Sequence, residues 1–78
     1  MTPQEICAAY RAELARLYGA EMAEKSWVYY GRGWYYINLA RRYGDGSVGT
    51  IGPASAYRKK QVLEMLENLR GREPKEET

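Results

Sequence analysis

Residues 27–39 read WVYYGRGWYYINL, and this stretch decides the fold of the chain. Trp and Tyr make up six of its thirteen residues, and a Gly-Arg-Gly link stands near its centre. Aromatic and β-branched residues favour strands, and a short link with two glycines permits a tight turn. The stretch therefore predicts a β-hairpin with strands at residues 27–30 and 34–39.

Two registers are compatible with this hairpin. A turn centred on Arg32-Gly33 pairs Val28 with Ile37 and Tyr30 with Tyr35, and a three-residue loop puts other residues opposite one another. The first register leaves Trp27, Tyr29, Trp34 and Tyr36 on one face, whereas the second groups Trp27 and Tyr29 with Tyr35 and Ile37. Because strand side chains alternate, both registers place Tyr35, Ile37 and Leu39 together, and we take that face as the core face. The outer face of the second strand then carries Trp34, Tyr36, Asn38, Ala40 and Arg42.

Aromatic residues occupy both odd and even positions of these strands, so their side chains point to both faces and one core cannot cover them all. Some Trp and Tyr side chains are expected on the outer face, beside arginines. Exposed aromatic surface of this kind is typical of interaction sites. The hairpin therefore predicts a surface that binds a macromolecule.

The first helix is predicted over residues 3–18. Thr2 is a suitable N-cap, Pro3 suits the first helical position, and Glu5 is placed to bond back to the cap. Gly19 either ends this helix or forms a weak point within a helix that continues through residues 20–24. Apolar side chains recur at helical spacing at Ile6, Tyr10, Leu14, Leu17 and Tyr18.

Beyond the hairpin, Asp45-Gly46 predicts a second tight turn followed by a third strand at residues 47–51. Gly52-Pro53 is expected to end the sheet, and a second helix starts between Pro53 and Tyr57 with Ser55 as a candidate cap. Gly71 stands where that helix should end. Its apolar stripe is formed by Val62, Met65, Leu66 and Leu69, with Leu63 on the flank.

These elements predict one α+β domain over residues 1–71 in the order α-β-β-β-α. Its three-stranded antiparallel meander carries the helices on one face and leaves the other face open. Residues 72–78 are polar and contain a proline, and we expect them to form a flexible tail.

The composition excludes several kinds of catalytic chemistry. The chain has no His and only Cys7, so neither a Ser-His-Asp or Cys-His arrangement nor a Cys/His zinc site can form within it. Glu64 and Glu67 have the spacing of a solvated helix face, and the glycines match no phosphate-binding motif. We therefore expect a binding protein without enzymatic activity, cofactor or metal.

Charge is concentrated in the middle of the chain. Residues 32–60 hold six Lys and Arg side chains against one Asp, although the net charge of the whole chain is only +2. Such a patch attracts polyanions or an acidic protein surface. Three strands followed by a helix entered through Arg58-Lys59-Lys60 resemble the arm-type DNA-binding domain of phage integrases over residues 26–70. Aromatic rings on an open sheet can also stack on exposed bases while basic side chains contact phosphates, so DNA or RNA is an alternative partner, for which Lys60 is a further candidate.

A small chain with these features also resembles the inhibitors that phages and mobile elements encode, the anti-CRISPR proteins above all. The resemblance rests on size, on the lack of catalytic equipment and on the exposed aromatic-basic sheet, and it implies a protein complex as partner, such as a CRISPR effector or another nuclease. A homodimer that covers the same rings is a third hypothesis. The residues expected to contact a partner are Trp27, Tyr29, Arg32, Trp34, Tyr36, Arg41, Arg42, Arg58 and Lys59.

The sequence also bears on location. No run of residues is long and apolar enough to cross a membrane, and the N-terminus lacks the basic and apolar regions of a signal peptide. The single cysteine allows no intrachain disulfide, which fits a reducing compartment. We therefore expect a cytoplasmic protein with no membrane partner.

Overall fold

The computed structural model describes residues 1–50 and 52–73. Helix α1 spans Pro3–Tyr18 and begins at the capping box expected from the sequence. The Thr2 N–H donates to Glu5 Oε1 at 2.8 Å, and the Glu5 N–H donates to Thr2 Oγ1 at 3.1 Å. Gly19, with φ of +95°, ends the helix, and a separate short helix α2 follows at Ala20–Lys25. Of the two sequence alternatives, Gly19 therefore acts as the stop.

The expected hairpin is present, and it has the register of the two-residue turn. Strand β1 spans Trp27–Gly31 and strand β2 spans Trp34–Asn38, with Val28 opposite Ile37. Arg32 and Gly33 have φ values of +53° and +83°. Positive φ at both central residues is the requirement of the type I′ turn, whose twist matches that of the strands it joins.

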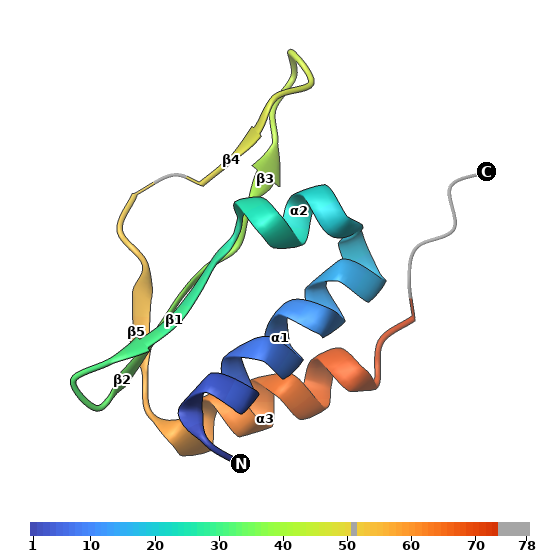
Figure 1. Ribbon diagram of the computed structural model, residues 1–78. Coiled ribbons are helices and arrows are strands. Elements are labelled where there is room, and N and C mark those ends of the chain that lie inside the picture. Colours follow the sequence, from blue (N-terminus) through green and yellow to red (C-terminus); the bar gives the residue numbers. More distant parts are fainter. Residues whose placement is uncertain (51, 74–78) are drawn as a thin grey trace.

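The third strand of the sheet is a different segment from the one expected. Strand β5, Ser55–Tyr57, pairs antiparallel with β2, so the sheet order is β1-β2-β5. The expected strand at residues 47–51 contributes only β4, Val48–Gly49, which pairs with β3, Arg41–Arg42, in a separate ribbon. Residue 51, the end of the expected strand, lies outside the described residues. Figure 1 shows this ribbon extending past α2, at the far end of the sheet from the β1–β2 turn.

The last helix, α3, spans Lys59–Arg70, so it begins later than the sequence suggested. Ser55 is paired with Ile37 in the sheet and does not cap the helix, because backbone pairing with β2 takes precedence over its capping tendency. Arg58 holds the N-cap position, and its N–H donates to Gln61 Oε1 at 3.1 Å. Gly71 occupies the C-cap as expected. The expected tail begins just beyond it, and residues 74–78 of that tail lie outside the described residues.

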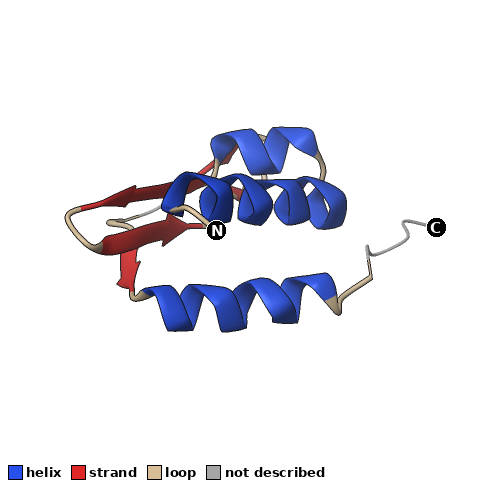
Figure 2. Cartoon of the chain, turned by 60° about the horizontal axis from the view of Figure 1, so that its bottom comes forward, coloured by secondary structure: helices blue, strands red, loops and turns tan. Residues whose placement is uncertain are grey.

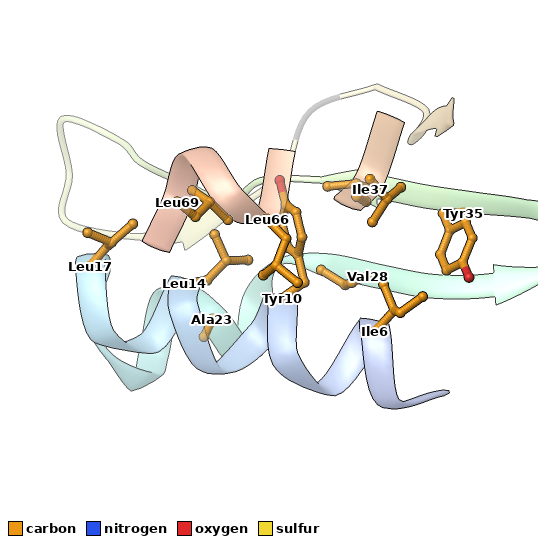
Figure 3. Packing of buried hydrophobic residues seen from close by; sticks show 11 residues of the cluster. Ile6, Tyr10, Leu14, Leu17, Ala23, Val28, Tyr35, Ile37, Leu66 and Leu69 are labelled. Atoms are coloured by element: carbon orange, nitrogen blue, oxygen red, sulfur yellow. The ribbon is translucent and has the colours of Figure 1, made fainter. Parts of the chain in front are cut away.

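The core lies between one face of the sheet and the two long helices. α1 contributes Ile6, Tyr10, Leu14 and Leu17, and these side chains meet Leu66 and Leu69 of α3 and Val28 of β1 (Figure 3). The helices run alongside each other in both views of the chain (Figures 1 and 2). A hydrogen bond joins α1 and α3 at one end, where Arg16 Nη2 donates to the Leu69 carbonyl oxygen at 2.8 Å. The α+β class and the three-stranded antiparallel sheet are therefore as the sequence predicts.

The alternation of buried and exposed side chains shifts by one residue after β2. The sequence pattern places Leu39 in the core and Ala40 outside it, but Leu39 is 40% exposed and Ala40 is 6% exposed. The strand ends at Asn38, so the two-residue period no longer applies to the following residues. Ala40 is instead held against Ser26, whose Oγ accepts the Ala40 N–H at 2.8 Å.

Candidate functional site

Four aromatic side chains share the sheet face that the helices leave open. We call Trp27, Tyr29, Trp34 and Tyr36 the outer aromatic face, since β1 and β2 bury their alternate residues on the opposite side. Trp27 is 53% exposed and Tyr29 is 45% exposed, whereas Trp34 and Tyr36 are half-buried. All four are expected from the sequence, and the register brings them together.

The rings of the outer aromatic face are ordered by contacts with one another. Tyr29 and Tyr36 stand opposite each other in the register and stack with ring centroids 5.0 Å apart at 21°. Trp27 lies next along β1, with its ring centroid 6.1 Å from that of Tyr29. On the other side of β2, Tyr36 is opposite Ala56 of β5. The arrangement of these rings is thus set by contacts within the chain itself.

Arg58 completes this face at the end nearest the β1–β2 turn. The register of β5 places Tyr57 opposite Tyr35, so the next residue lies beside Trp34. The Arg58 guanidinium carbon stands 3.7 Å from the centroid of the Trp34 ring, a cation–π contact. Arg58 Nη1 also donates to the Gly33 carbonyl at 3.2 Å. One side of the Trp34 ring is therefore already covered by a cation.

A second aromatic pair belongs to the core side of the hairpin. Tyr30 and Tyr35 are opposite each other in the register, with centroids 4.7 Å apart. Tyr35 is buried, and Tyr30 is exposed at the rim. The pair therefore extends the core to the edge of the sheet and does not belong to the outer aromatic face.

The basic residues expected at the site separate into two groups. Arg32 lies exposed in the β1–β2 turn, and Lys59 lies exposed at the start of α3, directly after Arg58. Arg41 and Arg42 are exposed on β3, in the ribbon beyond α2, at the other end of the molecule (Figure 1). The chain leaves the main sheet after Asn38, so Arg42 does not continue the outer face of β2 as expected, and Arg41 does not join the site either.

One feature near the site has no signal in the sequence. A hollow of about 410 Å³ lies between the N-terminal half of α1 and residues 28–30 of β1, and Cys7 and Arg11 are among the residues that line it. Its walls come from segments some twenty residues apart, so no local pattern reveals it. Burial raises the pKa of the Cys7 thiol, against a smaller lowering by the Arg11 guanidinium. Cys7 is therefore protonated at neutral pH, unlike an activated nucleophile.

The described residues offer neither a metal site nor a membrane span. They contain no group of three or more His, Cys, Asp or Glu side chains that could hold a metal ion. Within the same residues, no helix has the length and apolar character needed to cross a bilayer. Comparisons of the chain with protein-family models, with curated proteins and with solved structures found no match.

Proposed function

We propose that this chain is a non-enzymatic binding protein that engages a partner protein through the outer aromatic face. The observation that carries the proposal is the exposure of Trp27 and Tyr29 beside rings already fixed by Tyr36 and Arg58. Trp, Tyr and Arg are the residues enriched in binding hot spots, and preordered rings lose little conformational freedom on binding.

The ring arrangement favours a protein over exposed nucleic-acid bases. A base stacks on a free ring face, but one face of Trp34 is covered by Arg58 and the Tyr29 and Tyr36 rings cover each other. Arg41 and Arg42 lie on the separate ribbon, away from these rings, and so do not supply phosphate contacts beside them (Figure 1). The partner protein should present apolar surface bordered by acidic side chains, since Arg32, Arg58 and Lys59 flank the outer aromatic face with positive charge.

The class of partner to test first follows from the resemblance to small phage and mobile-element inhibitors. In this proposal the chain occupies a protein complex, such as a CRISPR effector or another nuclease, and blocks its activity by binding alone. Cytoplasmic action belongs to the same proposal, because such complexes work there and Cys7 requires no disulfide partner.

The test measures binding to a panel of purified CRISPR effector complexes and nucleases by biolayer interferometry, together with their cleavage of target DNA. For a complex that binds, Trp27→Ala combined with Tyr29→Ala should weaken Kd at least about 30-fold, because two central hot-spot rings are worth about 2 kcal/mol or more. Tyr18→Ala is the matched control, since Tyr18 is an exposed tyrosine of α1 outside the outer aromatic face. Equal effects of the double variant and the control would refute the proposed surface.

A nucleic-acid partner is the second candidate, and one observation favours it. Arg32, Arg58, Lys59 and Lys60 are all exposed at the turn end of the sheet, where Arg58 bonds to the turn itself. Fluorescence anisotropy of labelled DNA and RNA would show this mode as tight binding that weakens steeply with salt. In that case Lys59→Glu with Lys60→Glu should abolish binding, while Trp27→Ala with Tyr29→Ala should have the smaller effect.

A further inference from the structure

Strand β1 is an edge of the sheet with backbone groups directed away from it. Gly31 and Trp34 flank the two-residue turn, so they form a hydrogen-bonded pair, and the pairs alternate along the strands from there. Val28 and Tyr30 consequently direct their N–H and C=O groups toward the side opposite β2, where the Val28 carbonyl oxygen already accepts from Arg11 Nη2 at 3.5 Å. Within residues 1–50 and 52–73, no strand pairs with β1 on that side.

The two edges of the sheet differ in how well they are protected. Pro53 precedes the short strand β5, and the charged residues Arg58 and Lys59 follow it. A proline and charged side chains at an edge strand disfavour pairing with another strand. β1 has five residues, none of them charged and none of them proline, in a continuous register with β2. β1 is therefore the edge suited to accept an added strand.

The hollow beside α1 runs along this same edge. Residues 28–30 of β1 form one wall, and Gln4, Cys7, Ala8 and Arg11, which share one face of α1, form the other. A groove between an edge strand and a helix accepts an extended peptide, which gains main-chain bonds from the strand and side-chain contacts from the helix. Tyr29 borders both this groove and the outer aromatic face.

Charge within the groove indicates the chemistry of the occupant. Arg11 Nη1 donates to the carbonyls of Ala23 at 2.9 Å and Ser26 at 3.2 Å, and Nη2 lies 3.5 Å from the Val28 carbonyl oxygen. These bonds use three of the five guanidinium N–H groups, so two remain to meet a carboxylate. Among the described residues that line the groove, none is acidic.

A second copy of this chain fits the edge less well than an acidic segment does. If two β1 strands paired antiparallel with Val28 opposite the other copy's Tyr30, Lys25 of each copy would approach the Gly33 and Arg32 end of the other. β1 itself brings no acidic side chain to Arg11. Charge complementarity thus favours an acidic partner segment.

We propose that the groove between α1 and β1 binds an extended acidic segment of a partner protein, which pairs as an added strand with Tyr30 and with the Val28 N–H. A carboxylate of the segment meets the Arg11 guanidinium. The inference rests on the proposed function only in that the occupant is a protein, because the groove and the outer aromatic face are different surfaces.

The test is selection from a display library of random ten-residue peptides on the full chain, followed by titration of the selected peptides into ¹⁵N-labelled protein. We expect acidic sequences to be enriched and the amides of Val28 and Tyr30 to become protected from hydrogen exchange. Ala8→Glu should weaken peptide binding at least about tenfold by placing a carboxylate in the groove, since like charges at an interface disfavour binding strongly. Ala8→Lys introduces a side chain of similar length with the opposite charge, and it should leave peptide binding unchanged or tighten it. Ala12→Glu is the matched control, because Ala12 is exposed on α1 outside the groove.

Three outcomes would overturn the inference. The first is a failure to enrich any peptide, and the second is enriched peptides that bind equally well to Ala8→Glu and Ala8→Lys. The third is concentration-dependent dimerisation that protects the Val28 and Tyr30 amides without peptide, which would assign the edge to a second copy.

Because Tyr29 borders both surfaces, the groove and the outer aromatic face are separated with a variant of Trp34 in place of the Trp27 and Tyr29 double variant. Trp34 belongs to the outer aromatic face and does not line the groove, so Trp34→Ala should leave peptide binding unchanged. Ala8→Glu should in turn leave binding through the outer aromatic face unchanged. Failure of the groove proposal and failure of the proposed function are therefore observed in different variants.

Discussion

Replacing Gly33 by alanine tests the left-handed backbone of the β1–β2 turn, which lies beside the outer aromatic face. Gly33 has φ of +83°, and a Cβ there would meet Arg58 Nη1 at 3.6 Å, an ordinary contact. The cost is therefore that of a left-handed conformation for an L-residue, about 1–2 kcal/mol. Gly31 is the matched control, since it does not have positive φ and a Cβ there would meet nothing within 4 Å. Gly31→Ala should be neutral or stabilising by about 0.5–1 kcal/mol, because glycine is unfavourable within a strand.

The two variants should thus differ by roughly 2 kcal/mol in the free energy of unfolding. Urea denaturation followed by tryptophan fluorescence measures this difference, since both Trp residues lie on the hairpin. In thermal unfolding, Gly33→Ala should lower Tm by about 4–16 °C for a domain of this size. If Gly31→Ala were the more damaging change, a left-handed backbone at Gly33 would not be what the β1–β2 turn requires, and the type I′ turn would be refuted.

Other predictions concern the core, a buried hydrogen bond, a helix cap and the exposed rings. Ile6→Ala should cost about 2–4 kcal/mol in urea denaturation, because Ile6 is fully buried, and a loss below about 1 kcal/mol would contradict the packing. Ser26→Ala should cost about 1–3 kcal/mol and speed hydrogen exchange at the Ala40 amide, which loses its acceptor. Backbone and side-chain hydrogen bonds with Thr2 lower the pKa of Glu5 below 4.5 in the folded protein. As the pH falls, the Glu5 carboxylate is therefore protonated in the unfolded chain before it is protonated in the folded one. Stability should then fall as the pH drops from about 4.5 through the folded pKa. Glu5→Gln should flatten that part of the pH profile of stability. Trp27→Thr should change the free energy of unfolding by less than about 1 kcal/mol, and a larger loss would show that the Trp27 ring stabilises the folded chain.

Local signals in the sequence identified the features that depend on residues within a few positions of one another. The capping box at Thr2 was predicted outright, whereas the stop at Gly19 and the two-residue turn at Arg32-Gly33 were each one of two alternatives that the structure decided between. The alternation within residues 27–38 then assigned the outer aromatic face correctly once the register was known. These parts of the fold are predictable because the physical cause is local.

The third strand was not predictable for the opposite reason. Ser55–Tyr57 is three residues long, too short for a periodic pattern, and Pro53 and Ser55 are residues that favour the start of a helix. Pairing with β2 overrides that tendency, and only the tertiary fold provides it. The same pairing places Arg58 over Trp34, so this contact was also beyond local reasoning, although both residues were expected at the site.

The exposed rings present a physical problem that the fold alone does not resolve. Val28, Tyr35 and Ile37 fill the core face of the hairpin, so the opposite face needs only residues with good strand propensity, such as threonine. Trp27 and Tyr29 instead leave apolar surface in water, which brings a risk of aggregation and contributes little to the core. A partner that covers these rings would turn that unfavourable exposure into binding energy. The proposed binding function therefore accounts for the outer aromatic face better than folding does, and the same reasoning applies to the edge of β1, which no other strand covers within residues 1–50 and 52–73.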